Sequence, residues 1–324
     1  MTNQDKVLLS GIKPTGRPHI GNYFGAMKQF VDLQDEYRSF VFIANYHALT
    51  TVQDKDKLSE DTLDIALDYL AIGLDPQKVN LFIQSDVPEV TELAWILNCL
   101  TTVPYLSRAH AFKDAQAKNK EVNVGVFNYP VLMASDILIY SSNIVPIGKD
   151  QKQHLEIARD LAEKFNRIYG ETFKIPEPLI MKGVDIVPGI DGQKMSKSYN
   201  NTIPLFGTDD EIKRAVMSIV TDSKTPEEPK NPEECNIFAL HKLFSEEEIS
   251  EIKKRYVDGG IGYKESKEIL LKNIINFISP LRDKRSELAK DKESVLKILK
   301  NGGEKARAEA IAKMSEIREK VGLI

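Results

Sequence analysis

Two short stretches of the sequence carry residue types that suit the chemistry of phosphate groups. The first, PTGRPHIGNYFG, puts His19 and Asn22 on either side of Ile20 and Gly21, shortly after the apolar run VLL. A helix that begins near Gly21 directs its first backbone N–H groups and the positive end of its dipole at whatever lies above the strand. The same residues also suit a plain strand-to-helix turn with a capping asparagine. The rest of the chain has to decide between these two interpretations.

The second stretch is DGQKMSKSYNN, in which Lys194 and Lys197 stand three positions apart. Gly192 and the small polar residues around it indicate a loop. Two flexible ammonium groups on a loop are usually only a solvated surface. Such a loop can also close over a triphosphate and add positive charge where a leaving group becomes negative.

The elements that must position these residues alternate between short β-rich runs and helical stretches. Strands are predicted at 6–12, 39–45 and 79–85, and helices at 22–37, 57–73 and 88–100. This alternation predicts a parallel sheet with right-handed crossovers, in which ligands bind outside the carboxyl ends of the strands. The first phosphate-type stretch follows the first strand, so it is expected at that edge of the sheet.

Further along, a helix is predicted at 129–142, with Asp136 on an otherwise apolar segment. A short strand, a turn at Gly148 and a long amphipathic helix follow, and from Asp209 onward the chain is helical and rich in charge. We therefore predict an α/β fold with a Rossmann-like parallel-sheet catalytic domain and a C-terminal all-helical domain. The predicted domains are 1–200 and 201–324, and the last helix is a candidate to pack back on the catalytic domain. Trp95 is expected in the core, and 105–123 as a mobile flap.

Composition narrows the class of protein. The 324 residues are 42% hydrophobic and 28% charged, values of an ordinary globular protein, and they are too many for one typical core. The N-terminus lacks a secretory signal and no apolar run could span a bilayer, so a cytoplasmic location without membrane contact is expected. Cys99 and Cys235 are too few for a four-cysteine metal site or a disulfide framework. The net charge of −4 argues against general nucleic-acid binding but allows a local basic face.

PTGRPHIGN together with KMSKS resembles the signature pair of class I aminoacyl-tRNA synthetases. Asn22 replaces the second histidine that is usual in the family. This variant resembles the tryptophanyl subgroup, as do GKDQKQHLEIARDLAEKFN, YPVLMASDILIY and GGEKARAEAIAKM, so the resemblance runs over essentially the whole chain. It implies that L-tryptophan attacks the α-phosphorus of ATP, that tryptophanyl-adenylate forms with release of pyrophosphate, and that tryptophan then passes to tRNA(Trp). ATP is expected with Mg²⁺, with no metal site made by protein alone.

The resemblance implies an ATP site in three parts of the chain, with four residues in catalytic roles: His19, Asn22, Lys194 and Lys197. The ATP-binding residues are expected to be Lys13, Pro14, Thr15, Gly21, Asn22, Gly148, Lys149, Asp150, Val187, Lys194, Met195, Ser196, Lys197 and Ser198. Some have equally plain structural interpretations: Asp150 as a helix N-cap and Val187 as a core valine. The subgroup often carries glutamine at the Lys13 position, which leaves a phosphate contact by Lys13 open.

The expected tryptophan site centres on Asp136. A carboxylate on an apolar helix is costly unless it has a partner, and indole offers one N–H donor and no acceptor. The alternative is that a nearby arginine or backbone amide satisfies Asp136. The other residues expected there are Leu9, His47, Met133 and Gln151. His47 could equally be a core histidine, Lys113 contacts phosphate, tRNA or solvent, and His154 and His241 are interpreted as structural.

Three rival interpretations stay open. A tyrosyl-tRNA synthetase shares the fold, but that family normally carries a tyrosine on the first strand, where this chain has Val7, Leu8, Leu9 and Ser10. A nucleotidyltransferase also uses such a turn, yet the long helical region has no obvious role there. A non-catalytic nucleic-acid-binding module is the third. The subgroup is typically a homodimer, and segments 88–100 and 129–142 are the candidates for its interface.

Overall fold

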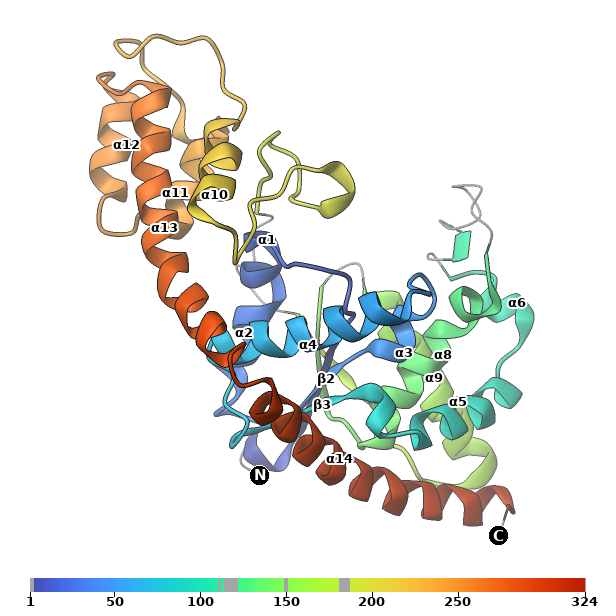
Figure 1. Cartoon of the computed structure of the whole chain (residues 1–324). Coiled ribbons are helices and arrows are strands. Elements are labelled where there is room, and N and C mark those ends of the chain that lie inside the picture. The colour runs from blue at the N-terminus through green and yellow to red at the C-terminus, as the bar shows by residue number, and fades with distance from the viewer. Residues whose placement is uncertain (1–2, 110–111, 114–121, 149–150, 181–186, 324) are drawn as a thin grey trace. The chain divides into compact units, whose positions relative to one another are not determined.

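The computed structural model describes residues 3–109, 112–113, 122–148, 151–180 and 187–323. Within them, five parallel strands form one sheet in the order β3-β2-β1-β4-β5, of which Figure 1 labels β2 and β3. The strands are β1 (Val7–Ile12), β2 (Arg38–Ile43), β3 (Val79–Ile83), β4 (Ile144–Ile147) and β5 (Glu177–Ile180). From β1 the chain adds β2 and then β3 on one side, and it then returns to add β4 and β5 on the other side of β1. The fold therefore has a switch point between β1 and β4, where open parallel sheets bind ligands.

Helices cover the sheet because successive side chains of each strand point to opposite faces. Val7 and Leu9 of β1 belong to the main core, whereas Leu8 packs with Leu33 and Ile144 in a second cluster. The helices of the described chain that contribute to the main core are α5 (Glu89–Leu100), α6 (Val103–Leu106), α8 (Val124–Ile139), α9 (Lys152–Tyr169) and α14 (Lys292–Val321). Two further helices, α3 (Asn45–Ala48) and α4 (Lys55–Ala71), follow β2.

The predicted alternation of strands and helices is confirmed, with three local corrections. The helix predicted at 22–37 is instead α1 (Ile20–Asn22), a π-helical turn η2 (Tyr23–Met27) and α2 (Lys28–Leu33). β5 was missed because it is four residues long, contains a proline and lies at the edge of the sheet. Trp95 was wrongly placed in the core, since 72% of it is exposed. Helical spacing put it on α5, but the buried face of α5 belongs to residues such as Leu93 and Leu97.

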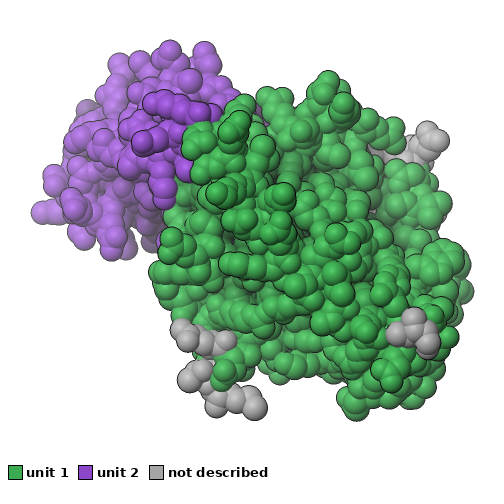
Figure 2. Space-filling view, turned by 60° about the horizontal axis from the view of Figure 1, so that its bottom comes forward, with its two compact units in different colours: residues 1–16, 31–182, 291–324 green, residues 17–30, 183–290 purple. Residues whose placement is uncertain are grey.

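The chain folds into two compact units, coloured separately in Figure 2. Unit 1 comprises residues 1–16, 31–182 and 291–324, and unit 2 comprises residues 17–30 and 183–290. Both phosphate-type stretches therefore fall largely or wholly in unit 2, with the helices α10 (Asp209–Met217), α11 (Asn236–Phe244), α12 (Ile249–Val257) and α13 (Tyr263–Leu288). These units are defined by packing, and the division into functional domains at 1–200 and 201–324 stays a prediction.

The last helix, α14, lies beside β3 in unit 1 (Figure 1). Gly302 makes this approach close, because a Cβ atom at that position would lie 2.0 Å from the carbonyl oxygen of Leu81. Arg307 pairs with Glu89 of α5 at 2.9 Å, and Arg318 pairs with Glu92. The helix thus covers a strand that stands at the edge of the sheet and would otherwise expose its backbone.

Unit 2 contains a buried polar network around His241, which is fully buried. Its Nδ1 lies 2.7 Å from Ser245 Oγ, and its Nε2 lies 3.0 Å from Ser266 Oγ, which also contacts the hydroxyl of Tyr256 at 2.7 Å. Burial lowers the pKa of His241 to about 4. The imidazole is therefore neutral at neutral pH and acts as a structural side chain, as the sequence predicted.

This network predicts a pH-dependent stability. The folded-state pKa of His241, about 4, lies below its usual value of 6.5, so its stabilisation is complete above pH 6.5 and is lost as pH falls toward 4. Between pH 7 and pH 5 the free energy of unfolding should drop by up to about 2 kcal/mol through this group. Urea unfolding at both pH values should show a smaller drop in His241→Gln. An equal drop in the parent and the variant would contradict this assignment.

Candidate active site

The predicted carboxylate Asp136 lies at the centre of a buried polar cluster in unit 1. Asp136 is 2% exposed, and its Oδ2 lies 2.9 Å from His47 Nε2. Gln84 Nε2 lies 2.8 Å from Oδ1 and 2.9 Å from Oδ2. Among the residues that the structure describes, the side-chain partners of Asp136 are therefore a histidine and a glutamine, and an arginine is not one of them. His47, which follows β2, and Gln84, which follows β3, meet at the carboxyl edge of the sheet, where parallel folds bind their ligands.

A second chain of contacts leads from this cluster to the start of α9. The ring of Tyr129 stands edge-on to that of His47, with centroids 6.2 Å apart. Its hydroxyl lies 2.7 Å from His154 Nε2, and His154 Nδ1 lies 3.0 Å from Gln151 Oε1. The sequence prediction named His47, Asp136 and Gln151 but missed Gln84 and Tyr129. A glutamine directly after a strand, and a tyrosine opening the Asp136 motif, were the available signals.

The remaining residues predicted in unit 1 have these positions. Leu9 is 2% exposed within the main core, and Met133 is half-buried against it. Lys13 donates to Thr50 Oγ1 at 2.9 Å, and burial lowers its pKa. Pro14 is buried, Thr15 and Gly148 are exposed, and Lys149 and Asp150 lie outside the described residues. Lys13 and Gly148 directly follow the neighbouring strands β1 and β4 at the switch point.

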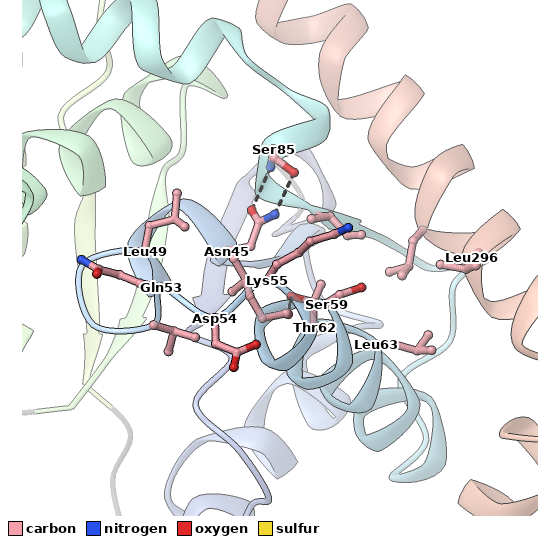
Figure 3. Close-up of a pocket in the computed structure, with 14 residues that line it drawn as sticks. Asn45, Leu49, Gln53, Asp54, Lys55, Ser59, Thr62, Leu63, Ser85 and Leu296 are labelled. Carbon is pink, nitrogen blue, oxygen red and sulfur yellow. Dashed lines mark hydrogen bonds between the residues drawn. The ribbon is translucent and has the colours of Figure 1, made fainter.

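Two cavities adjoin the residues that hold the cluster. One of about 420 Å³ is lined in part by Tyr46, Tyr129 and Leu132. The other, of about 610 Å³, lies between α3, α4 and α14, and Asn45 and Ser85 form part of its wall (Figure 3). Open volume therefore lies on the Tyr129 side of the polar cluster.

The first phosphate-type stretch lies in unit 2, where His19 caps α1. Its Nδ1 accepts the N–H of Asn22 at 3.2 Å, and Asn22 Oδ1 accepts the N–H of His19 at 3.1 Å. Burial and the positive charge of Lys197 lower the pKa of His19 to about 4. Because Nδ1 is an acceptor and the ring is neutral, Nε2 carries the proton and is available as a donor. The structure thus confirms the capping interaction, and the use of the remaining ring N–H toward an anion stays a prediction.

The second stretch is ordered by Asn201, which is 1% exposed and was not predicted. Asn201 Oδ1 accepts the N–H of Ser196 at 2.8 Å, and its Nδ2 donates to Asp191 Oδ1 at 2.8 Å and to the carbonyl of Lys194 at 3.1 Å. Met195 is buried and donates its N–H to the carbonyl of Val187. The side chains of Lys194 and Lys197 are exposed on the loop.

Backbone contacts join the first stretch to the residues that directly follow the second stretch, within unit 2. The N–H of Ile20 donates to the carbonyl of Ile203, and the N–H of Leu205 donates to the carbonyl of Pro18, both at 3.0 Å. A Cβ atom at Gly21 would lie 3.2 Å from the Cβ of Met195. Glycine therefore lets the start of α1 pack against the lysine loop, so that one unit contains an imidazole N–H and two ammonium groups. Such a set of donors suits phosphate oxygens.

A comparison with protein families shows the family of this chain. The family model described as tRNA synthetases class I (W and Y) matches residues 1–279, most of the chain. The structure has the fold that the sequence predicted, with helices around a parallel sheet and further helices after the lysine loop. The chain therefore belongs to the class I tRNA synthetases, a family of enzymes.

Individual relatives show to which group within the family this chain belongs. A tryptophan–tRNA ligase of Fusobacterium nucleatum is 54% identical over 318 residues, 98% of each chain, and one of Rhodopirellula baltica is 49% identical over 98% and 99% of the two chains. The crystal structure of tryptophanyl-tRNA synthetase from Campylobacter jejuni complexed with ADP and tryptophan matches with a TM-score of 0.93, at 48% identity over 98% and 99% of the chains. Within the class I synthetases, this chain belongs to the tryptophan–tRNA ligases.

Proposed function

We propose that this ligase activates L-tryptophan with ATP to tryptophanyl-adenylate and then transfers tryptophan to tRNA(Trp), with the residues assigned below. In the first step the tryptophan carboxylate forms a bond to the α-phosphorus, and the bond to the β-phosphate oxygen breaks. Pyrophosphate leaves with the electron pair. Alignment and stabilisation of the developing charge account for most of the acceleration in such a transfer, so no protein nucleophile is required.

The observation that carries the proposal is the buried carboxylate of Asp136. Indole has one N–H donor and no acceptor, so an acceptor at the floor of the pocket matches it. Met133, three positions before Asp136 on α8, is half-buried and is assigned to the ring, since a thioether packs well on an aromatic face. Leu9, His47 and Gln151 are assigned to the same pocket.

The ATP contacts are assigned to the donors that the sequence predicted for them. His19, with its neutral ring and Nε2–H, donates to phosphate oxygens, and Asn22 and Gly21 contribute the start of α1. Lys194 and Lys197 balance the charge of the leaving pyrophosphate. The remaining assigned residues are Lys13, Pro14, Thr15, Gly148, Lys149, Asp150, Val187, Met195, Ser196 and Ser198.

Magnesium belongs to this proposal as a companion of the nucleotide. Among the residues that the structure describes, no group of three or more His, Cys, Asp or Glu side chains could hold a metal ion. Mg²⁺ keeps most of its water and binds readily to phosphate oxygens. We therefore assign it to the ATP phosphates, where it would neutralise negative charge.

The direct test is pyrophosphate exchange that depends on the amino acid, measured with tryptophan and tyrosine side by side. Exchange with tryptophan alone, followed by charging of tRNA(Trp), is the expected result. Exchange with tyrosine alone would favour the tyrosyl alternative. No exchange with either amino acid would contradict the proposed enzyme activity.

The helical part of unit 2 is proposed to bind tRNA through phosphate contacts. Five basic residues of this part are candidates for such contacts, and three of them, Lys213, Arg214 and Lys284, are exposed. By contrast, Arg282 donates to the carbonyl of Gly207 and pairs with Asp209, and Arg285 lies over the ring of Phe206. The last two residues thus also support the structure, so the first three are better targets for mutation.

Charge reversal of Lys213, Arg214 and Lys284 together is expected to weaken tRNA charging about tenfold or more and to leave pyrophosphate exchange within about twofold. Charging by the parent should fall as the salt concentration rises, and charging by the variant should fall less steeply. Charge reversal of Lys297 and Lys300, exposed on α14 in unit 1, is the matched control. Equal loss of exchange and charging would contradict a separate tRNA-binding role.

The homodimer and the cytoplasmic location stay part of the proposal. Of the two segments considered for an interface, α8 buries Val131, Ile137 and Leu138, whereas α5 exposes Trp95. An exposed tryptophan on a short apolar helix is typical of a protein interface, so α5 is the favoured segment. In the described ranges, no helix combines the length and apolarity that a bilayer crossing needs.

A further inference from the structure

Gln84 is a buried amide that lies against Asp136. It is 1% exposed and opens the short 3-10 turn η3 (Gln84–Asp86), directly after β3. Its Nε2 contacts both carboxylate oxygens of Asp136, at 2.8 and 2.9 Å, whereas His47 contacts only Oδ2. Rotation of the carboxylate out of this position would break both contacts with Gln84.

The orientation of the Gln84 amide follows from its other end. Gln84 Oε1 accepts the backbone N–H of Tyr46 at 3.1 Å, so the NH₂ group must face Asp136. The neighbouring residues hold α3 and η3 together: Asn45 Nδ2 donates to Ser85 Oγ at 2.8 Å, and the N–H of Ser85 donates to Asn45 Oδ1 at 3.1 Å (Figure 3). The amide is therefore held in one orientation from both sides.

The two carboxylate oxygens of Asp136 differ in the number of polar contacts that they make. A carboxylate oxygen can accept about two hydrogen bonds. Within the described part of the chain, Oδ2 has two polar contacts, with Gln84 and His47, and Oδ1 has one, with Gln84. An acceptor direction is left on Oδ1.

We propose that Gln84 is a positioning residue that holds the Asp136 carboxylate so that Oδ1 accepts the indole N–H of tryptophan. The inference rests on the proposed function, since it takes tryptophan as the ligand of Asp136. Gln84 acts through Asp136 and sets how strongly the enzyme prefers a ring with an N–H donor over one without it. Its removal therefore changes substrate preference, and the chemical step is left largely unchanged.

The test compares L-tryptophan with β-(3-benzothienyl)-L-alanine, in which sulfur replaces the N–H group. The parent enzyme should prefer tryptophan by about ten- to a hundredfold in kcat/KM for pyrophosphate exchange. Gln84→Met keeps the side-chain length and removes both polar ends. It should lower that preference at least about fivefold through the KM for tryptophan, with kcat and the KM for ATP within about twofold.

Gln34 offers a matched control. Its Nε2 donates to the carbonyl of Gly73 at 3.4 Å and its Oε1 accepts the N–H of Asp75 at 2.8 Å, the same two-sided pattern elsewhere in unit 1. Gln34→Met should keep the parent's preference for tryptophan even if it melts at a lower temperature. A change of preference through general destabilisation would appear in both variants.

A second variant, Gln84→Glu, gives a readout that a purely structural role would not produce. The introduced carboxyl can donate to Asp136 only when it is protonated, so the KM for tryptophan should fall as pH is lowered from about 8 to about 6. The parent contains the same neighbouring ionisable groups, among them Asp136, His47, Asp86 and Tyr140, and serves as the control for pH effects that do not come from position 84.

The outcomes separate the inference from the function on which it rests. An unchanged preference in folded Gln84→Met overturns the role of Gln84 while the proposed function stands. If Gln84→Met does not fold, a KM for tryptophan in Gln84→Glu with the same pH profile as in the parent overturns it equally. A parent enzyme that exchanges pyrophosphate with both substrates equally well would instead remove the assignment of Asp136 to the indole N–H.

Discussion

Asp136→Ala is expected to raise the KM for tryptophan about ten- to a hundredfold, with the KM for ATP nearly unchanged. A hydrogen bond to a charged acceptor contributes roughly 1.5 to 3 kcal/mol, and the variant leaves the indole N–H without a partner in a buried pocket. His47 and Gln84 also lose their shared acceptor, which adds to the effect. Pyrophosphate exchange at varied tryptophan concentration measures it.

Two further variants make this result specific. Asp136→Asn keeps the shape of the side chain and replaces one acceptor oxygen by a donor, so it should be nearly as impaired as Asp136→Ala. Asp61→Ala removes another buried carboxylate of unit 1, one that pairs with Lys57 on α4. It should leave both KM values unchanged. A folded Asp136→Ala enzyme with the parent's efficiency toward tryptophan would make Asp136 a structural residue.

Lys197→Ala is expected to lower the rate of tryptophan activation about a hundred- to a thousandfold. Removal of one preorganised donor from a site of developing negative charge typically has this effect. Because the ammonium group is assigned to the leaving pyrophosphate, the loss should appear in kcat and hardly in the affinity for tryptophan. Single-turnover adenylate formation, followed by rapid quench, measures the chemical step directly.

An exposed lysine elsewhere in unit 2 provides the control. Lys254 on α12 carries the same charge, and Lys254→Ala should activate tryptophan at the parent's rate. Lys194→Ala should resemble Lys197→Ala, although the two losses need not add if both groups act on the same oxygens. Near-normal adenylate formation by Lys197→Ala would remove the loop from the mechanism.

Local patterns in the sequence were sufficient to predict the fold class. Apolar runs such as VLLSGI and FVFIAN are short and follow one another between helical stretches, which is typical of buried parallel strands. The sequence did not predict β5, because its four residues include Pro178 and it lies at the edge of the sheet. The periodicity of α5 predicted a helix but misplaced Trp95, since the side of a short apolar helix that faces the core depends on its neighbours.

The sequence by itself determined the chemistry available to this protein, because residue types such as the acceptor of Asp136 and the ammonium groups of Lys194 and Lys197 are visible without a structure. Only the tertiary structure decided their partners. Gln84 meets Asp136 across 52 residues of chain. Asn201 orders the lysine loop through hydrogen bonds to separate residues within it. Such contacts follow from the packing of a helix against the end of a distant strand and from the path of a loop, and neither leaves a periodic trace in the sequence.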